Sequence, residues 1–205
     1  MTAHIFAGGE MRSMDFIRIG TGDLIICADS GYKYAEQLRV NPDIIVGDFD
    51  SYSGELPESA PILRSVPEKD DTDTLLAVKT AIESGAEEIR IYGALGGRFD
   101  HAIANVQTLK YAWEHGCEAS LEDESNTVTL HGAGERRYKR RDDRYFSVFS
   151  YSGELQIKRL SGVKYTLKDA VISDSFPIGV SNEFVDDEAV LEILRGTALV
   201  ISSSK

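Results

Sequence analysis

The sequence has few basic residues for its length. It carries 22 Lys+Arg against 34 Asp+Glu among 205 residues, a formal net charge of −12. Nucleic acids and anionic membrane surfaces bind proteins with a positive surface. We therefore expect no nucleic acid and no membrane as partner. An anionic small molecule stays compatible with this composition, because a bound divalent cation can reverse the local charge.

Long apolar runs and a targeting segment are also missing. An early apolar run, residues 24–28, is far shorter than the roughly 20 residues of a membrane-spanning helix. The first ten residues lack a basic region followed by an apolar stretch, so no signal peptide is expected. The two cysteines, Cys27 and Cys117, sit in apolar contexts and suit buried thiols better than a disulfide. Together these features predict a cytoplasmic protein.

Several motif-defined enzyme classes are excluded. The chain has no C-x-x-C, no H-E-x-x-H and no G-x-S-x-G, and no glycine is followed by lysine. The first three absences remove zinc-ribbon and dithiol sites, zincin proteases and serine hydrolases with a nucleophile elbow. The last one removes the P-loop nucleotide-binding motif.

The first half of the chain alternates strand and helix signals. Continuous apolar runs at 4–9, 23–28, 43–46 and 88–92 predict strands buried on both faces. Helical periodicity predicts helices at 32–39, 73–84 and 101–115, with Ile103, Val106, Leu109 and Trp113 sharing one face of the last helix. This order is typical of an α/β domain with a mostly parallel sheet.

The second half changes to short β-like runs separated by turns. They lie at 127–130, 145–149, 154–157, 163–167, 189–193 and 197–201, and they predict an all-β antiparallel sandwich. A charged stretch at 122–124 precedes the first of them. We therefore place the domains at 1–124 and 125–205.

Acidic residues gather where the predicted strands end or helices begin. They are Asp29, Asp48, Asp50, Asp70, Asp71, Asp73 and Asp100. Ligands of open α/β sheets bind at the carboxyl edge of the strands. So many carboxylates would repel one another there unless one or two Mg²⁺ ions lay among them.

Two segments show this clustering of acidic residues most clearly. Asp48 and Asp50 are two residues apart on an extended segment, so both can approach one metal; the alternative is a pair of loop acids in turns. Asp73, beside Thr72, is a third possible metal ligand, and Lys69 could meet a phosphate. The alternative is that Asp71 or Thr72 simply caps the helix.

A third segment, residues 96–101, opens a helix with two glycines, an arginine and an aspartate. Glycine amides and Arg98 can bind phosphate oxygens, although Asp100 could instead be only an N-cap. The basic run at 136–141 is interpreted as part of a solvated hairpin arm.

Six short segments follow one another along the chain: Ala-Asp-Ser-Gly at 28–31, Gly-Asp-Phe-Asp-Ser at 47–51, Asp-Asp-Thr-Asp at 70–73, Gly-Arg-Phe-Asp-His at 97–101, Ser-Gly-Val-Lys-Tyr at 161–165 and Ser-Asn-Glu at 181–183. These motifs, in this order, strongly resemble the thiamin pyrophosphokinase family. The resemblance implies an α/β catalytic domain at 1–124 that binds nucleotide and metal, and a thiamin-binding β-sandwich at 125–205. It also implies a homodimer with shared active sites, and transfer of the terminal diphosphate of ATP to the thiamin hydroxyl with Mg²⁺, which gives thiamin diphosphate and AMP.

The resemblance also assigns roles residue by residue. Metal binding falls to Asp48, Asp50 and Asp73, and catalytic roles fall to Asp73, Arg98 and Asp100. Nucleotide contacts fall to Thr72 and Arg98, and thiamin contacts fall to Ser181 and Asn182. Asp29, Lys69 and Gly97 are further expected binding residues. The chain departs from the family at Val163 and Thr166. Its single tryptophan, Trp113, lies in the first half, whereas some members stack thiamin on a tryptophan of the second; Phe184 is our candidate substitute.

Two other functions fit parts of the pattern. A metal-dependent nucleotide-sugar transferase would also use paired aspartates, but it would release a nucleoside diphosphate. A nucleotide or thiamin sensor would bind without turnover and would not need so many acids. The residues alone leave open which carboxylate meets the thiamin hydroxyl.

Overall fold

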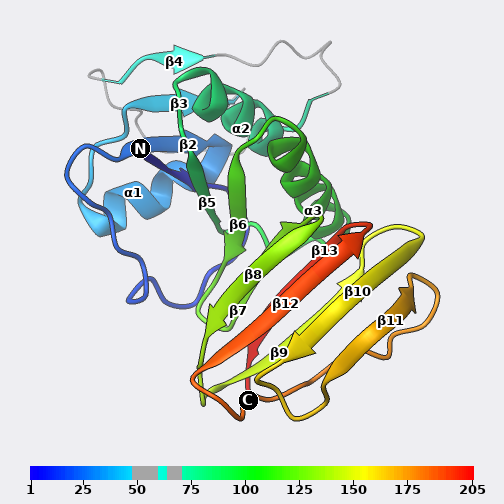
Figure 1. Ribbon diagram of the computed structural model, residues 1–205. Helices are drawn as coiled ribbons and strands as arrows, with labels where there is room; N and C mark the ends of the chain where they lie inside the picture. Colours follow the sequence, from blue (N-terminus) through cyan, green and yellow to red (C-terminus); the bar gives the residue numbers. More distant parts are fainter. Residues whose placement is uncertain (48–59, 64–70) are drawn as a thin grey trace. The chain divides into compact units, whose positions relative to one another are not determined.

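The computed structural model describes residues 1–47, 60–63 and 71–205 (Figure 1). These residues divide into two compact units, Met1–Glu124 and Ser125–Lys205. The predicted segment with Asp48 and Asp50, and the predicted Lys69, lie outside the described residues.

The first unit contains a parallel sheet of short, buried strands. Its strands are β1 (Thr2–Phe6), β2 (Leu24–Ala28), β3 (Ile44–Val46), β4 (Ile62–Leu63), β5 (Glu88–Tyr92) and β6 (Glu118–Glu122). They follow the order β4-β3-β2-β1-β5-β6, and every pairing between neighbours is parallel. The continuous apolar runs of the sequence correctly predict β1, β2, β3 and β5, because both faces of these strands are covered.

Helices cover the two faces of this sheet (Figure 1). A short 3-10 turn, η1 (Asp29–Gly31), leads into α1 (Tyr32–Leu38), and Tyr34 packs with Phe6, Cys27 and Tyr92 on one face. The other face carries α2 (Asp73–Glu83) and α3 (Phe99–Glu114). The apolar face of α3 is covered only in part: Leu109 is buried, whereas Ile103 is 48% exposed and Trp113 is 37% exposed.

The carboxyl ends of β1 and β5 meet backbone to backbone. Ala7 donates its N–H to the Tyr92 carbonyl at 2.8 Å, and Gly9 donates to the Gly93 carbonyl at 2.9 Å. A Cβ at Gly9 would lie 2.5 Å from the Gly93 oxygen, and a Cβ at Gly93 would lie 2.5 Å from the Ala7 oxygen. Only glycine fits this approach. Because β2 lies on one side of β1 and β5 on the other, this is the switch point where open α/β sheets bind ligands.

A polar group is buried at the middle of β1. The His4 side chain is 1% exposed; its Nδ1 lies 3.0 Å from the Tyr92 hydroxyl, and its Nε2 lies 3.1 Å from Asp23 Oδ2. The same Asp23 oxygen accepts the Gly20 N–H at 2.7 Å. The Gly20 amide, with His4 as a further contribution, holds the pKa of Asp23 below its ordinary value. This group ties the loop before β2 to the sheet.

The second unit is a sandwich of two antiparallel sheets. Its strands are β7 (Asn126–His131), β8 (Gly134–Lys139), β9 (Arg144–Ser150), β10 (Glu154–Ser161), β11 (Leu167–Ser173), β12 (Glu188–Arg195) and β13 (Ala198–Ser204). One sheet has the order β7-β13-β9 and the other the order β11-β10-β12-β8. Alternate residues of both sheets meet in one core, for example Phe146, Leu191 and Val200. The predicted fold class, a parallel α/β domain followed by an antiparallel sandwich, is confirmed.

The β predictions need two kinds of correction. The segment 163–167 is not a strand; the strand begins at Leu167 as β11. Three strands, β4, β6 and β8, were not predicted. The basic run lies largely within β8, which pairs with β12. There Arg137 forms ion pairs with Glu135 and Glu188, so the charges are matched locally across exposed strand faces.

Both cysteines are buried and free, as predicted. Among the helices of the described residues, none has the length and apolar character needed to cross a membrane.

The Asp23→Asn variant tests the buried polar group. It should have a free energy of unfolding lower by about 1–2 kcal/mol near neutral pH, because the charged acceptor for Gly20 and His4 is lost. The folded-state pKa lies below 3.8, so this stabilisation is present above that pH and is lost as the pH falls through the folded value. Urea denaturation at about pH 7 and about pH 2.5 should show the difference between parent and variant shrinking in acid. Asp15→Asn, at an exposed position of the same loop, is the control and should change little.

Candidate active site

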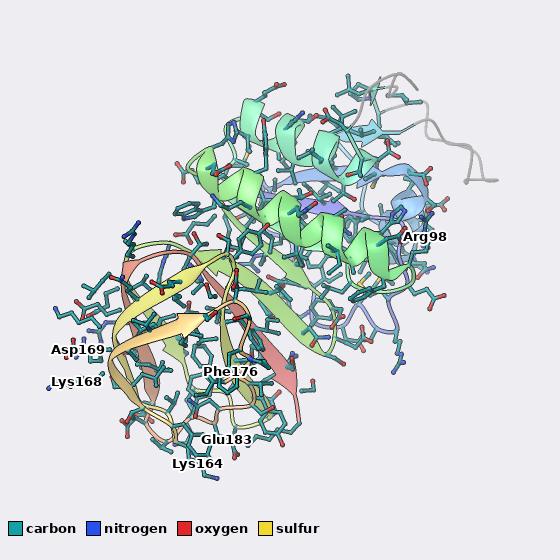
Figure 2. The ribbon with its side chains drawn as sticks, turned by 90° about the vertical axis from the view of Figure 1, so that its right-hand side faces the viewer. Arg98, Lys164, Lys168, Asp169, Phe176 and Glu183 are labelled. Carbon is teal, nitrogen blue, oxygen red and sulfur yellow. The ribbon has the colours of Figure 1, made fainter. Side chains whose placement is uncertain are left out.

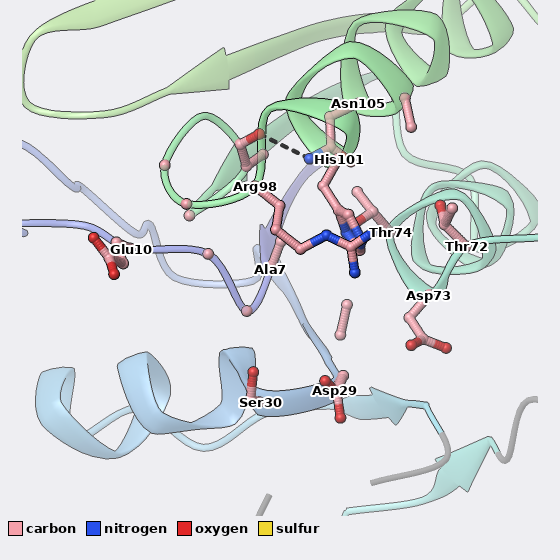
Figure 3. A pocket seen from close by; sticks show the side chains of 18 of the residues that line it. Ala7, Glu10, Asp29, Ser30, Thr72, Asp73, Thr74, Arg98, His101 and Asn105 are labelled. Atoms are coloured by element: carbon pink, nitrogen blue, oxygen red, sulfur yellow. Dashed lines mark hydrogen bonds between the residues drawn. The ribbon is translucent and has the colours of Figure 1, made fainter. Parts of the chain in front are cut away.

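A cavity of about 590 Å³ opens at the switch point of the α/β unit (Figure 3). It is lined by the loops after β1, β2 and β5 and by the first turns of α2 and α3. Its volume lies in the range of small-molecule sites. The sheet topology therefore places the cavity where the sequence pattern predicts a ligand.

The loop after β1 forms one wall and is held by α1. Lys33 Nζ donates to the Gly8 carbonyl at 2.9 Å, and the Tyr34 hydroxyl donates to the Gly9 carbonyl at 2.5 Å. Burial raises the pKa of Tyr34, which keeps its hydroxyl protonated as a donor. These bonds fix a glycine-rich backbone at the edge of the cavity.

The start of α3 brings a positive charge to the cavity. Gly97 (φ 85°) and Arg98 both line it. Arg98 donates Nε to one Asp100 oxygen at 3.1 Å and Nη2 to the other at 2.5 Å. The arginine lowers the pKa of Asp100, so this carboxylate is ionised at neutral pH. Asp100 does not cap α3 with its side chain; the N-cap residue is Arg98, and it makes no side-chain cap.

The start of α2 brings acids and a cap. The Thr72 hydroxyl accepts the Leu75 N–H at 3.2 Å, so Thr72 is the N-cap that the sequence allowed. Asp71 is paired with Lys79 at 2.6 Å, and this bond raises the pKa of Lys79. Asp73 lines the cavity from the first turn of the helix.

Asp29, at the end of β2, is the remaining acid at this edge. Its backbone is left-handed (φ 49°), and its Oδ1 is buried without a hydrogen-bond partner in the described part of the chain. A buried carboxylate oxygen facing a polar cavity suits a hard cation such as Mg²⁺, which selects oxygen ligands. Among the described residues alone, no group of three His, Cys, Asp or Glu side chains forms a complete metal site.

The predicted site residues separate into three groups. The cavity brings together Asp29, Thr72, Asp73, Gly97 and Arg98, with Asp100 bound to Arg98 beside it. Ser181 and Asn182 lie in the β unit. Asp48, Asp50 and Lys69 lie outside the residues that the structure describes.

In the β unit, Asn182 acts on its own chain. Its side chain is buried; Oδ1 accepts the Tyr165 N–H at 3.0 Å, and Nδ2 donates to the Tyr165 carbonyl at 2.8 Å. Ser181 is left-handed (φ 59°) and donates its N–H to the Ser147 hydroxyl at 3.0 Å. These bonds fix the backbone of both segments.

The structure places Phe184, the candidate aromatic cover, in the sandwich core. Phe184 is only 9% exposed, and its ring packs 5.3 Å from that of Phe146 in the sandwich core. Tyr165 is instead 64% exposed on the backbone that Asn182 clamps. Lys164 and Glu183, which flank Tyr165 and Asn182, form an ion pair at one end of the sandwich (Figure 2).

Two parts of the cavity were missed in the sequence. One is the loop from Ala7 to Glu10, which the Gly-Gly pair after the first apolar run could have indicated. The other is Asn105, a 7% exposed cavity residue whose Nδ2 donates to the Ala94 carbonyl at 2.8 Å (Figure 3). It lies one helical turn after His101, and no motif singles it out.

Comparison with known proteins covers both units. The family model "Thiamin pyrophosphokinase, catalytic domain" matches residues 19–121, and "Thiamin pyrophosphokinase, vitamin B1 binding domain" matches residues 136–196. The thiamine pyrophosphokinase of Bacillus subtilis (strain 168) is 28% identical over 211 residues, which cover 99% of each chain. The crystal structure of the Bacillus subtilis thiamine pyrophosphokinase superposes with a TM-score of 0.90 at 26% identity, over 100% of both chains. That of the thiamin pyrophosphokinase from Geobacillus thermodenitrificans gives a TM-score of 0.87 at 28% identity, over 100% of this chain and 98% of the other.

Asn105 offers a test of the cavity wall. Asn105→Ala leaves the buried Ala94 carbonyl without its donor, so we expect the free energy of unfolding to fall by about 1–3 kcal/mol. The loop after β5 should also become more accessible to amide hydrogen exchange. Gln107→Ala removes an exposed amide from the same helix and should leave both measurements near the parent. Equal effects of the two substitutions would contradict a bracing role for Asn105.

Proposed function

The chain belongs to the thiamin pyrophosphokinase family, and from this premise we propose how its residues divide the work of the reaction. The enzyme transfers the diphosphate group of ATP to the hydroxyl of thiamin and releases AMP. The single observation that best supports the division is the switch-point cavity, which joins a glycine-rich backbone, Arg98 and several carboxylates in one space.

We propose that the α/β unit holds the nucleotide. The backbone of Gly97 faces the phosphate chain. Arg98 donates to phosphate oxygens, and its planar guanidinium can donate to two oxygens at once. Thr72 and Lys69 are the other proposed nucleotide contacts. Reactions of this type depend mainly on positioning and on stabilising the charge of the transition state.

The carboxylates suit a divalent cation. Asp73, together with Asp48 and Asp50 from outside the described residues, would hold Mg²⁺. When bound, Mg²⁺ supplies positive charge to the phosphate oxygens and so offsets the repulsion between ATP and the acids. Asp100, kept ionised by Arg98, is the proposed acceptor for the thiamin hydroxyl proton as that oxygen attacks the β-phosphorus and the bond to the α-phosphate breaks.

We propose that the β unit binds thiamin. Ser181 provides a polar contact, and Asn182 acts by clamping the backbone of Tyr165. Tyr165 replaces Phe184 as the aromatic cover, because an exposed ring on a fixed backbone can stack on the pyrimidine with little loss of conformational freedom. The further proposals are a homodimer, in which the acids of one chain and the thiamin contacts of its partner form each site, and a cytoplasmic location, which the buried free thiols support.

The reaction itself can be tested by product analysis. With ATP, Mg²⁺ and thiamin, the purified protein should form AMP and thiamin diphosphate in equal amounts, and chelation of the metal should stop it. Asp73→Asn should lower turnover at least about 100-fold, since charge at the metal site is lost. Glu83→Gln, at the far end of the same helix, is the matched control. Formation of ADP and thiamin monophosphate would refute diphosphate transfer.

Tyr165 should serve thiamin and not ATP. We expect Tyr165→Ala to raise the KM for thiamin about tenfold, in line with the loss of one to three kcal/mol of stacking, and to leave the KM for ATP within twofold. Tyr165→Phe keeps the ring and should restore most of the affinity. A parallel rise in both KM values would point to a folding defect.

Mixed dimers test the shared site. Asp73→Asn chains, which should be nearly inactive, and Tyr165→Ala chains, which should keep about a tenth of the parent activity at limiting thiamin, are co-expressed so that about half of the dimers are mixed. Each mixed dimer then has one site with both substitutions and one with neither, so activity should return to roughly a quarter of the parent. If mass spectrometry confirms mixed dimers and no activity returns, the two residues serve a site within one chain.

A further inference from the structure

Three polar side chains of α3 form a row along the cavity. Arg98, His101 and Asn105 all line it, and their spacing in the sequence places them on one side of the helix (Figure 3). An α-helix rises about 1.5 Å per residue, so Asn105 lies about 10 Å farther along α3 than Arg98. This separation is comparable to the length of a nucleoside. The row therefore begins at the residue proposed to bind phosphate and ends at an uncharged amide.

The Asn105 side chain is held in one orientation. It is 7% exposed, and its Nδ2 donates to the Ala94 carbonyl at 2.8 Å. Turning the amide over would bring Oδ1 against that carbonyl oxygen, and both atoms are hydrogen-bond acceptors. Ala94 is itself buried, so bulk water would not replace the lost donor. Nδ2 is therefore committed to the loop after β5, and Oδ1 is left for a different partner.

The Oδ1 atom of Asn105 is an acceptor that the protein itself does not use. In the described part of the chain, the bond from Nδ2 to Ala94 is the hydrogen bond that this side chain makes. Unlike Oδ1 of Asp29, the Asn105 oxygen is not fully buried. Because Asn105 borders the cavity, its oxygen is open to a ligand there. A largely enclosed acceptor in a ligand site favours a ligand with a hydrogen-bond donor at that point.

The chemistry of the amide decides which donor fits. An ionised triphosphate presents only acceptor oxygens, which would repel Oδ1. A neutral N–H or O–H group can donate to it. In the nucleoside half of ATP, such groups are the 6-amino group of adenine and the ribose hydroxyls. The small residues Ala94 and Ala104 line the cavity beside Asn105 and leave space for a nucleoside.

We propose that Asn105 is a specificity residue whose Oδ1 accepts a hydrogen bond from the nucleoside half of ATP, at the adenine amine or at a ribose hydroxyl. This inference rests on the proposed nucleotide-binding function of the cavity. The bond to Ala94 makes the selection one-sided. A nucleotide with an acceptor at the same point would face an amide that cannot turn over, so it would be rejected.

Three nucleotide analogues identify the donor. Purine riboside triphosphate lacks the 6-amino group, and 2′-deoxy-ATP and 3′-deoxy-ATP each lack one ribose hydroxyl. Their binding to the full chain is compared with that of ATP by calorimetry, with Mg²⁺ and without thiamin, so that no group is transferred. The parent should bind at least one analogue about tenfold more weakly than ATP, because that analogue leaves Oδ1 unpaired. Loss at the amine and loss at a hydroxyl name different donors, and either result supports the inference.

Substitutions of Asn105 show whether it is the source of this preference. In Asn105→Ala, ATP and the discriminating analogue should bind within about twofold of each other, because neither meets an acceptor. The ratio is taken within one variant, so a general loss of affinity cancels. Asn105→Asp keeps an acceptor oxygen but cannot donate to Ala94, and it should retain the preference. A purely bracing role predicts the same ratio for both variants. Gln107→Ala, an exposed amide of the same helix, is the matched control and should behave as the parent.

Two results overturn the inference. One is a parent that binds all three analogues within twofold of ATP, a measurement that needs no variant. The other is a preference that Asn105→Ala retains, because another residue would then contact the nucleoside. If Asn105→Ala does not fold, Asn105→Ser, whose short hydroxyl can bond within the helix, takes its place.

Product analysis of the parent is run separately. A parent that forms AMP but shows no preference among the analogues would leave the proposed function standing and refute this inference. A parent that forms no AMP, but whose preference disappears in Asn105→Ala, would refute the proposed function and leave this inference standing.

Discussion

The close contact between the ends of β1 and β5 is the constraint on which the switch-point cavity depends. Two parallel strands that share an edge can have their following loops in contact only if the side chains there are removed. Gly9 and Gly93 do this, and their backbones then bond directly to each other. Lys33 and Tyr34 lock one loop from α1, and Asn105 locks the other from α3. The cavity wall is consequently backbone, which suits a ligand rich in phosphate oxygens.

The carboxylates around that wall differ in whether they have a basic partner. Asp71 and Asp100 have basic partners on their own or the adjacent helix, and these pairs are satisfied before any substrate arrives. Asp29 has no such partner for its buried oxygen among the described residues. An acidic chain can therefore bind an anionic substrate without a basic surface, provided that the uncompensated carboxylates are neutralised by a cation that arrives with it. The net charge of −12 and an ATP site are compatible for this reason.

In the β unit, one side-chain amide holds a backbone segment in place. Asn182 uses its amide to pair with the Tyr165 backbone as a neighbouring strand would, at a position where no strand continues. Asn182, which the sequence predicts as a thiamin contact, thus holds the backbone of the exposed Tyr165. Phe146 and Phe184 fill the core behind it, so the tyrosine ring is presented from a rigid support.

The sequence by itself determined the fold of both units and the family. Continuous apolar runs, glycines after helices and short alternating runs predict the parallel unit and the sandwich, because burial on two faces or one dictates those patterns. The ordered aspartate motifs indicate the family and its reaction. Tertiary structure alone decided which residues act where. Phe184 and Tyr165 look alike in sequence, yet only packing buries one ring and exposes the other. The close approach of Asp29 to Gly47 and the brace from Asn105 to Ala94 join residues that are 18 and 11 positions apart in the chain, and no local pattern encodes such contacts.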